Sequence, residues 1–490
     1  MHGVVSAGHP LTAEAGAVVL RAGGNAVDAA LAAMLTSFVA EPLLNGLGAG
    51  GYLLVAAPER EPVLLDFFVE APGRGRDPAA RAPLVPVDVS FGDAVQVFNV
   101  GAASCGVYGT PAGVCEAHRR FATMPLTELA APAARLAREG VRINPEQAHI
   151  HDILSPITGC SPEARAELWV EGHSPQVGDV LRDPALADSL ERLGADGEAP
   201  FYEGDIAAAV VEHVAERGGM LTAEDLRAYT PAAREPVRAA YRGREVLTNP
   251  PPSAGGILIA YTLARLDRSP GPASVTELVA AMEEAQEART PSFIEGLARP
   301  GFQDEFLGAR LGNTTHLSVL DAAGGACAIT CTNGEGSGVV VPGTGLHLNN
   351  MMGEQDLSPL GYFSHPPGRR LPSMMAPTVV LCDGRPELVL GSAGSNRIRS
   401  AILQVVLAVL DGGLAVDAAV DAPRLHWEDG VVYVEPGIDV AALEAEGRTV
   451  ARFRDRNVFF GGVQAVRRDP ASGALTGAGD PRRGGVAVTA

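Results

Sequence analysis

Lysine is absent from the sequence, so every basic side chain other than histidine is an arginine. A chain without lysine cannot form a Schiff base with a carbonyl substrate and cannot supply the lysine of a P-loop. Cysteine is scarce, with six residues in 490 and no Cys-x-x-Cys pair. These absences argue against a disulfide framework and against a zinc or iron–sulfur site. We expect no metal and no other cofactor, and we interpret Cys327 and Cys331 as small core residues.

Basic residues are fewer than acidic ones: 38 arginines and 58 acidic residues give a formal net charge of −20. Such a surface repels nucleic acids and anionic membranes, so we expect neither as a partner. The first residues lack the basic segment and apolar run of a signal peptide, and the longest apolar stretch, 401–410, is too short to span a bilayer. We therefore expect a cytoplasmic protein.

With 46% hydrophobic residues in 490, the chain can bury a large core. The first part of the chain has a clear helical pattern. Apolar spacing predicts helices over 12–21 and 25–40, with Asn25 as the N-cap of the second helix and Asp28 in its first turn. Strands are expected over 52–56 and 63–68. A mainly helical segment follows, and residues 287–312 are interpreted as a linker.

The last part of the chain is rich in strand patterns. Strands are predicted over 317–320, 327–332, 338–341, 346–348, 378–381 and 387–390, and a helix over 399–410. An order of helices first and paired strands later is typical of an α+β fold in which packed sheets are covered by helices.

Four residues before the first of these strands, Asn313-Thr314-Thr315-His316, have a possible chemical role. If the peptide bond before Thr314 is cut, that residue gains a free α-amine beside its own hydroxyl. Nucleophile and base are then one residue, and an α-amine with a pKa of roughly 7.7–8.0 can accept a proton at neutral pH. Threonine is also common in strands, so the pair by itself is more often a part of the scaffold.

Five segments together resemble the γ-glutamyltransferase family of N-terminal nucleophile hydrolases. They run in the family's order through essentially the whole chain: residues 7–10 with 23–30, then 109–113, 251–256, 313–316 and 391–395. The resemblance implies a four-layer αββα sandwich, self-cleavage before Thr314, and acyl transfer through a threonyl ester. It also implies a large chain of residues 1–313 and a small chain of residues 314–490, which stay together as a heterodimer.

The catalytic residues of the family are retained in the resemblance. Thr314 matches the nucleophile, and Thr332 matches a second threonine whose hydroxyl orients it, although an ordinary strand threonine is the alternative for Thr332. The backbone N–H groups of Gly394 and Ser395 match the oxyanion hole, with Ser395 in place of a glycine. His316 is expected to support the strand and not to move protons.

The residues that bind the donor's carboxylate differ from the family. An arginine that clamps this carboxylate after an Asp-Phe pair is replaced by Phe68, which removes a bidentate, charge-assisted contact. Two consecutive serines that assist the clamp become Ser373 and Met374. If a cation has replaced the clamp, the candidates are Arg424, Arg482 and Arg483.

The residues that hold the donor's ammonium group differ as well. The polar residue after Asn349-Asn350 becomes Met351, with Asn350 retained, and an aspartate becomes Glu354. An asparagine two residues after the second threonine aligns with Gly334. Met351 and Met374 could also serve only to fill space.

These changes predict a self-processing hydrolase or acyltransferase whose small-molecule acyl donor is not a plain γ-glutamyl peptide. The reason is that buried polar groups without a ligand partner cost free energy, so a pocket for another substrate is expected to lose them together. Family members that act on antibiotic precursors, by amide or C–C cleavage, are similar in this respect, by analogy. Water or an amine is the acceptor. The alternatives are an ordinary γ-glutamyltransferase or glutathione hydrolase, and an uncleaved, non-catalytic binding homologue.

Overall fold

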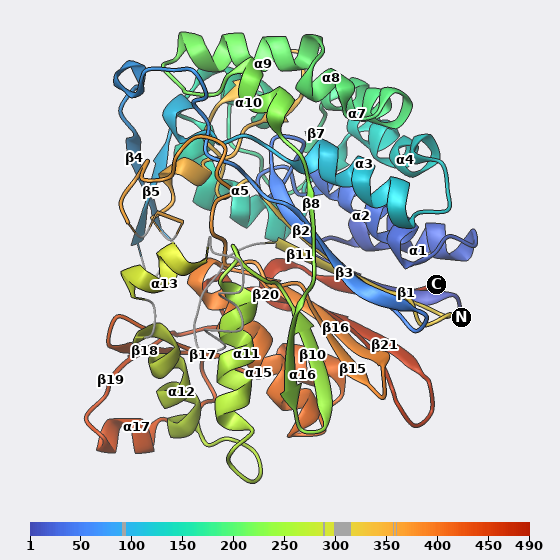
Figure 1. Cartoon of the computed structure of the whole chain (residues 1–490), viewed down its shortest axis with the longest axis vertical. Coiled ribbons are helices and arrows are strands. Elements are labelled where there is room, and N and C mark those ends of the chain that lie inside the picture. The colour runs from blue at the N-terminus through green and yellow to red at the C-terminus, as the bar shows by residue number, and fades with distance from the viewer. Residues whose placement is uncertain (91–94, 288–289, 298–314, 356, 359) are drawn as a thin grey trace.

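Two β-sheets lie at the centre of the computed structural model (Figure 1). The structure describes residues 1–90, 95–287, 290–297, 315–355, 357–358 and 360–490, with the backbone alone at positions 291, 292, 294, 315 and 395. The predicted nucleophile, Thr314, and its neighbour Asn313 lie outside the described residues.

The larger sheet has seven strands and is antiparallel throughout. In spatial order its strands are β22 (Val486–Thr489), β1 (Gly3–Ala7), β11 (Thr315–Asp321), β12 (Ala326–Thr332), β2 (Gly50–Ala57), β3 (Arg60–Phe67) and β8 (Ala232–Arg234). The central pair, β11 and β12, fits the strands predicted over 317–320 and 327–332. The chain ends meet at the edge of this sheet, where the N–H of His2 donates to the carbonyl of Ala490 at 2.7 Å (Figure 1).

The smaller sheet has six strands, again all antiparallel. In spatial order they are β21 (Leu475–Gly479), β20 (Gly462–Arg468), β16 (Arg385–Ala393), β15 (Thr378–Cys382), β10 (Arg244–Thr248) and β9 (Val237–Tyr241). Strand β11 of the larger sheet contacts β16 and β20 of the smaller one. An apolar cluster joins the two sheets, with Leu54, Leu320 and Val389 among its fully buried members.

Helices cover the larger sheet on its other side (Figure 1). They include α1 (Pro10–Arg21), α2 (Ala26–Ala40), α3 (Thr110–Phe121), α4 (Leu126–Glu139), α7 (Pro184–Asp196), α8 (Ala199–Tyr202), α9 (Asp205–Glu216) and α10 (Ala223–Ala228). Helix α2 is buried along its whole length, because its small and apolar side chains leave no polar face. Its predicted start is confirmed: Asn25 is the N-cap, and it forms a capping box with Asp28.

A second group of helices packs on the smaller sheet: α11 (Gly255–Leu266), α12 (Val275–Glu287), α15 (Ile398–Leu410) and α16 (Val416–Asp421) (Figure 1). Strand β12 shows how side chains divide between the layers. Cys327 and Cys331 point into the cluster with the first group of helices, whereas Ala326 and Ala328 point into the cluster between the sheets. Both cysteines are buried and free, which confirms their interpretation as core residues.

Smaller elements surround this centre. They are the hairpin of β4 (Val85–Ser90) and β5 (Val95–Val100), α5 (Pro145–Thr158), α6 (Pro162–Leu168), β6 (Val141–Arg142), β7 (Val180–Leu181), β13 (Val340–Val341), β14 (Leu346–His347), β17 (Leu425–Glu428), β18 (Val431–Val434), α17 (Ala441–Ala445) and β19 (Thr449–Arg452). Helix α13 (Pro291–Gly296) corrects the predicted linker over 287–312, because Thr290 caps a short helix there. No helix in the described ranges combines the length and the apolar character needed to cross a bilayer.

Candidate active site

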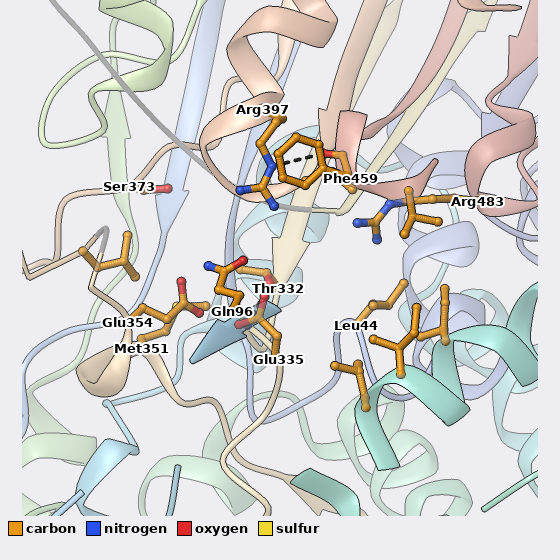
Figure 2. A pocket seen from close by; sticks show the side chains of 18 of the residues that line it. Leu44, Gln96, Thr332, Glu335, Met351, Glu354, Ser373, Arg397, Phe459 and Arg483 are labelled. Carbon is orange, nitrogen blue, oxygen red and sulfur yellow. Dashed lines mark hydrogen bonds between the residues drawn. The ribbon is translucent and has the colours of Figure 1, made fainter. Parts of the chain in front are cut away.

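One cavity lies where the end of β12 meets the end of β16 (Figure 2). Six of the residues predicted from the sequence as catalytic or substrate-binding line it: Phe68, Thr332, Met351, Glu354, Ser373 and Gly394. Thr332 ends a strand of the larger sheet, Gly394 follows a strand of the smaller sheet, and the others lie in connecting segments. The fold thus gathers residues that are far apart in the chain.

Thr332 is the last residue of β12 and is 7% exposed. Its Oγ1 accepts the N–H of Gly334 at 2.8 Å, which leaves the hydroxyl proton and a second lone pair for another partner. The neighbouring strand β11 begins at Thr315, opposite Cys331. Thr332 therefore lies beside the point at which the described part of β11 starts.

Gly394 lies between Ala393, the last residue of β16, and the short helix η4 (Ser395–Arg397). Its φ is +119°, and a Cβ at this position would lie 2.5 Å from the Cα of Gly461. Only glycine fits such a conformation and such a close approach. The backbone of Gly394 is therefore fixed at the cavity wall. Its neighbour Ser395 is described by its backbone only, as the first residue of η4.

Phe68 occupies the position of the family's arginine clamp and forms an apolar wall of the cavity. It is 1% exposed, and its ring stacks on Tyr52 with centroids 5.5 Å apart. The N–H of Phe68 donates to Asp66 at 3.0 Å, and its carbonyl accepts the hydroxyl of Tyr229 at 2.8 Å. Asp66 is neutralised by Arg234, with 2.7 Å between Nη2 and Oδ2. The backbone groups of Phe68 and the carboxylate of Asp66 are thus paired within the protein and not with the cavity.

Gly334 leaves space for two side chains of the segment that follows Asn349, those of Asn350 and Glu354. Its φ is +71°, and a Cβ would lie 2.0 Å from Glu354 Oε1 and 2.1 Å from Asn350 Oδ1. Asn350 is fully buried behind the wall, where its Oδ1 accepts the N–H of Glu335 at 3.1 Å. Met351 begins the short helix η3 (Met351–Gly353) and lines the cavity itself. The missing side chain at Gly334 is what makes room for the amide and the carboxylate.

Ser373 and Met374 have different surroundings although they are adjacent. Ser373 lines the cavity, its Oγ accepts the N–H of Met375 at 3.0 Å, and its carbonyl accepts the hydroxyl of Ser253 at 3.0 Å. Met374 was predicted to face the donor, but its side chain is 2% exposed and belongs to the apolar cluster under α11 and α15. Successive residues of an extended segment point to opposite sides, so only one of the pair can reach the cavity. Met374 is a packing residue.

His316 on β11 is buried and held by two hydroxyls. Its Nδ1 lies 2.9 Å from Thr330 Oγ1 and its Nε2 lies 2.8 Å from Ser318 Oγ. Burial lowers the pKa of His316 to about 3, so the ring is neutral at physiological pH. A Cβ on Gly391 would lie 2.3 Å from the ring, which shows how closely His316 packs against β16. The histidine joins the two sheets and fits the expected supporting role.

Among the described residues, two arginines line the cavity, and others near it are paired inside the protein. Arg424 is 1% exposed and pairs with Asp480 at 2.6 Å, while Arg482 pairs with Asp480 and Glu435. Arg483 lines the cavity, and so does Arg397, which the sequence reasoning missed. The one available signal for Arg397 was its place three residues after the predicted oxyanion glycine.

The sequence agrees with one family over nearly its whole length. Residues 12–297 and 298–490 match the family model described as Gamma-glutamyltranspeptidase. The chain belongs to the gamma-glutamyltranspeptidase family.

Two relatives and one solved structure illustrate the range of this family. The acylase ACY 1 proenzyme of Pseudomonas sp. (strain SE83) is 32% identical over 523 residues, covering 99% of this chain and 93% of the relative. The glutathione hydrolase proenzyme of Escherichia coli (strain K12) is 31% identical over 534 residues, covering 98% and 90%. The cephalosporin acylase from Bacillus halodurans has a TM-score of 0.84 at 28% identity, covering 99% and 95%.

Membership of the gamma-glutamyltranspeptidase family makes the chain an enzyme of the hydrolase and transferase class. Its mixed helix and sheet content agrees with that of the family's solved structures. Within the described ranges, no group of three His, Cys, Asp or Glu side chains is placed to hold a metal ion. The polar side chains that line the cavity carry hydroxyl, carboxylate and guanidinium groups and, at Gln96, an amide.

Proposed function

We propose that this chain is a self-processing hydrolase or acyltransferase of the gamma-glutamyltranspeptidase family whose donor is not a plain γ-glutamyl peptide. The observation that carries the proposal is the composition of one cavity. Thr332 and Gly394, which match the family's catalytic machinery, face the same space as Phe68 and Met351. The catalytic residues match the family, and the wall that selects the donor is apolar at the position of the family's arginine clamp.

Self-cleavage starts from Thr314. Its role is inferred from the match to the family, and the residue after it, Thr315, pairs with Cys331, which directly precedes Thr332. The Thr314 hydroxyl attacks the carbonyl carbon of Asn313, the peptide C–N bond breaks, and an ester forms with a free α-amine. Water then hydrolyses the ester and yields the chains 1–313 and 314–490. The proenzyme names of the Pseudomonas and Escherichia coli relatives support this step.

Turnover uses the same hydroxyl. The α-amine of Thr314 takes the hydroxyl proton as Oγ attacks the donor carbonyl. The backbone N–H groups of Gly394 and Ser395 donate to the developing oxyanion, and the leaving group departs with the proton from the ammonium. Water or an amine then attacks the threonyl ester and releases the acyl group. The Thr332 hydroxyl accepts an N–H of the Thr314 amine and holds it in position.

The fold that carries this site is the four-layer αββα sandwich. Three apolar clusters support this arrangement: one between the first helices and the larger sheet, one between the sheets, and one between the smaller sheet and the second group of helices. The order of the layers in Figure 1 agrees with it.

The donor is a small molecule with an apolar part that packs on Phe68 and Met351, and with polar groups that reach Glu354 and Ser373. Asn350 supports this wall from behind. Among the relatives, one is named an acylase and one solved structure is a cephalosporin acylase, which favours a secondary-metabolite precursor such as an antibiotic intermediate. The bond that is broken is an amide C–N bond or an activated acyl C–C bond.

A second candidate function, that of an ordinary γ-glutamyltransferase or glutathione hydrolase, is favoured by one observation. Arg397 and Arg483 line the cavity and supply positive charge that replaces the missing clamp. A chromogenic γ-glutamyl anilide separates the two functions. We expect slow release that does not saturate, whereas fast and saturable release would make the ordinary function the correct one.

The nucleophile is tested by substitution of Thr314. Thr314→Ala removes the attacking hydroxyl, so we expect one undivided band in denaturing electrophoresis and loss of activity by about 10⁴-fold or more, as for other deleted nucleophiles. Thr314→Ser keeps a hydroxyl and is the matched control, which should still divide into two bands. Cleavage of the alanine variant would show that the nucleophile is another residue.

A further inference from the structure

Helix α5 contributes an apolar wall to the cavity, apart from the residues that match the family. We call it the α5 wall, and it consists of four side chains that line the cavity: Leu44, Ile150, Ile153 and Leu154. Figure 2 shows Thr332 between Leu44 on one side and Met351 and Ser373 on the other. The α5 wall and the residues at the family's donor-binding positions therefore lie on opposite sides of Thr332.

Three residues of the wall share one face of helix α5. Ile150, Ile153 and Leu154 follow the i, i+3, i+4 spacing, so their side chains lie side by side. Two of them are buried, whereas Ile153 is half-buried and keeps accessible surface where it lines the cavity. A ligand that covers Ile153 removes this apolar surface from water, which favours binding.

Hydrogen bonds fix helix α5 at its start and near its proline. The side chain of Asn144 accepts the N–H of Gln147 at 2.7 Å and caps the first turn. Pro156 has no N–H, so the carbonyl of Asp152 lacks its helical donor. The hydroxyl of Ser155 donates to that carbonyl at 2.8 Å instead. The wall is thus presented by a well-formed helix.

An apolar cluster supports the α5 wall from behind. Two residues of the wall belong to this cluster, and the other two, Leu44 and Ile153, pack against it. Its remaining buried members come from several elements: Leu43, Val89, Phe98, Val100, Ile157, Ala164, Leu168 and Val340. A wall with packed side chains behind it cannot retreat, so its shape is set before a ligand binds.

Leu44 joins the wall to the catalytic strand. Its carbonyl accepts the N–H of Asn333 at 3.0 Å, and Asn333 directly follows Thr332. A group that binds on the wall therefore lies next to the predicted reaction centre.

The direction of the substrate follows from the proposed function, on which this inference rests. The carbonyl carbon under attack lies beside Thr332 and Gly394, and its acyl group extends toward Phe68 and Met351. The leaving group is bonded to the same carbon and extends to the opposite side, where the α5 wall lies. An amine acceptor approaches from the side on which the leaving amine departs, so the wall contacts it as well.

We propose that the α5 wall is a subsite for a bulky apolar leaving group. The substrate class is an amide whose nitrogen carries an apolar chain or ring, and the same subsite binds an apolar amine acceptor. Pockets for such ligands are lined mostly by apolar side chains, with a few polar groups that fix the orientation. Selectivity for the acyl half and for the amine half of the substrate thus resides on different elements of the fold.

Two isomeric amides test the α5 wall. N-(3-phenylpropyl)acetamide carries its apolar group on the leaving amine, and N-methyl-4-phenylbutanamide carries the same group on the acyl side. Ile153→Asn replaces apolar surface with an amide, so we expect kcat/KM for N-(3-phenylpropyl)acetamide to fall by about tenfold, through KM. For N-methyl-4-phenylbutanamide the change should be less than about twofold, because its phenyl group packs away from α5. Chromatography of the released phenyl-bearing product measures both rates.

Two further variants separate loss of the subsite from loss of the fold. Ile153→Leu keeps the apolar surface and should stay within about twofold of wild type for both amides. Val18→Asn is the matched control, since Val18 is a β-branched residue of helix α1 that is 49% exposed, and its replacement should change neither rate. With Ile153→Asn, an equal fall for both isomers, or a fall confined to N-methyl-4-phenylbutanamide, would overturn the assignment of the wall to the leaving group.

Calorimetry with the two amides tests the same subsite without turnover. We expect Ile153→Asn to bind N-(3-phenylpropyl)acetamide about tenfold more weakly than wild type, and its affinity for the isomer to stay within about twofold. No binding to the wild-type protein, or an equal loss for both isomers, would refute the subsite. Failure of the chain to divide before Thr314 would refute the proposed function instead, and the calorimetric comparison would still decide whether the wall binds an apolar leaving group.

Discussion

At the scale of single residues, Gly334 and Gly394 shape the cavity through the side chains that they lack. Gly394 has a backbone conformation that disfavours a Cβ, and it lies so close to Gly461 that a Cβ would clash with it. Gly334 leaves room for the oxygens of Asn350 and Glu354. The departure from the family asparagine at Gly334 is thus linked to the other changes in the donor wall, because a side chain there would occupy the same space.

Gly334→Ala is expected to lower activity by more than it lowers stability. The left-handed backbone makes alanine unfavourable by about 1–2 kcal/mol, and the two oxygens near the new Cβ must move away. Because they are the ends of side chains, most of the effect should appear as a loss of roughly tenfold or more in kcat/KM, the size expected when a positioned polar contact is lost. Activity assays and denaturant unfolding measure the two effects.

Gly343→Ala is the matched control. Gly343 has a φ of +73° against +71° for Gly334, but a Cβ there meets no atom within 4 Å. The control should show the same backbone penalty with unchanged kcat/KM. Equal activity in the two variants would mean that Asn350 and Glu354 have no role in the cavity.

At the scale of elements, helix α2 ends in a buried carboxyl group. Glu41 is the C-cap residue of α2 and is 3% exposed, and its Oε1 accepts the hydroxyl of Thr12 at 3.0 Å. Burial raises the pKa of Glu41 to about 7, although the hydrogen bond and the charge of Arg483 oppose the shift. The end of this helix is therefore expected to change its charge near neutral pH.

The stability of the protein should depend on pH through Glu41. Its pKa is higher in the folded state than in the unfolded state, so the folded protein holds a proton that the unfolded chain has released. The contribution to stability is complete below pH 4.5 and is lost as the pH rises through about 7. Relative to that of wild type, the free energy of unfolding of Glu41→Gln should increase by on the order of 3 kcal/mol between pH 4 and pH 8, from 1.36 kcal/mol per pKa unit.

Unfolding at several pH values measures this dependence, in the Thr314→Ala background where one chain is expected. Glu59→Gln, which removes an exposed carboxylate from the turn between β2 and β3, is the control and should show no such trend. A pH profile of Glu41→Gln parallel to that of wild type would contradict the raised pKa.

At the scale of the whole molecule, each sheet contains strands from both sides of the predicted cleavage point. In the larger sheet, β11 lies between β1 and β12, and β1 also pairs with β22. In the smaller sheet, β10 pairs with β15. A cut before Thr314 would break one covalent bond and leave these hydrogen-bonded ladders and the three apolar clusters in place.

The cleaved protein should therefore behave as one particle. We expect the fragments 1–313 and 314–490 to elute together in size-exclusion chromatography and to separate only in denaturant, because central strands of one fragment pair with strands of the other. Mass spectrometry of the denatured sample should identify threonine as the first residue of the smaller fragment. Separate elution in native buffer would contradict the shared sheets.

Much of the fold was predictable where local pattern and long-range packing agree. The start of α2 and the strands β11, β12, β15 and β16 follow from apolar spacing and capping. Strands β1, β9 and β10 were not predicted, because they are short and are stabilised by partners far away in the chain. Helix α13 was missed for a similar reason, since a single turn and a half has little periodicity to detect.

The sequence alone determined the family, the helices and strands with strong periodicity, and the residues that could act as nucleophile and oxyanion donors, because these depend on residue type and order. Only the tertiary structure decided which side chains share the cavity. It separated Met351 from Met374, and it divided the arginines into those paired with Asp480 and Glu435 and the two that face open space. Burial and ion pairing arise between elements distant in the chain, so no local pattern could have fixed them.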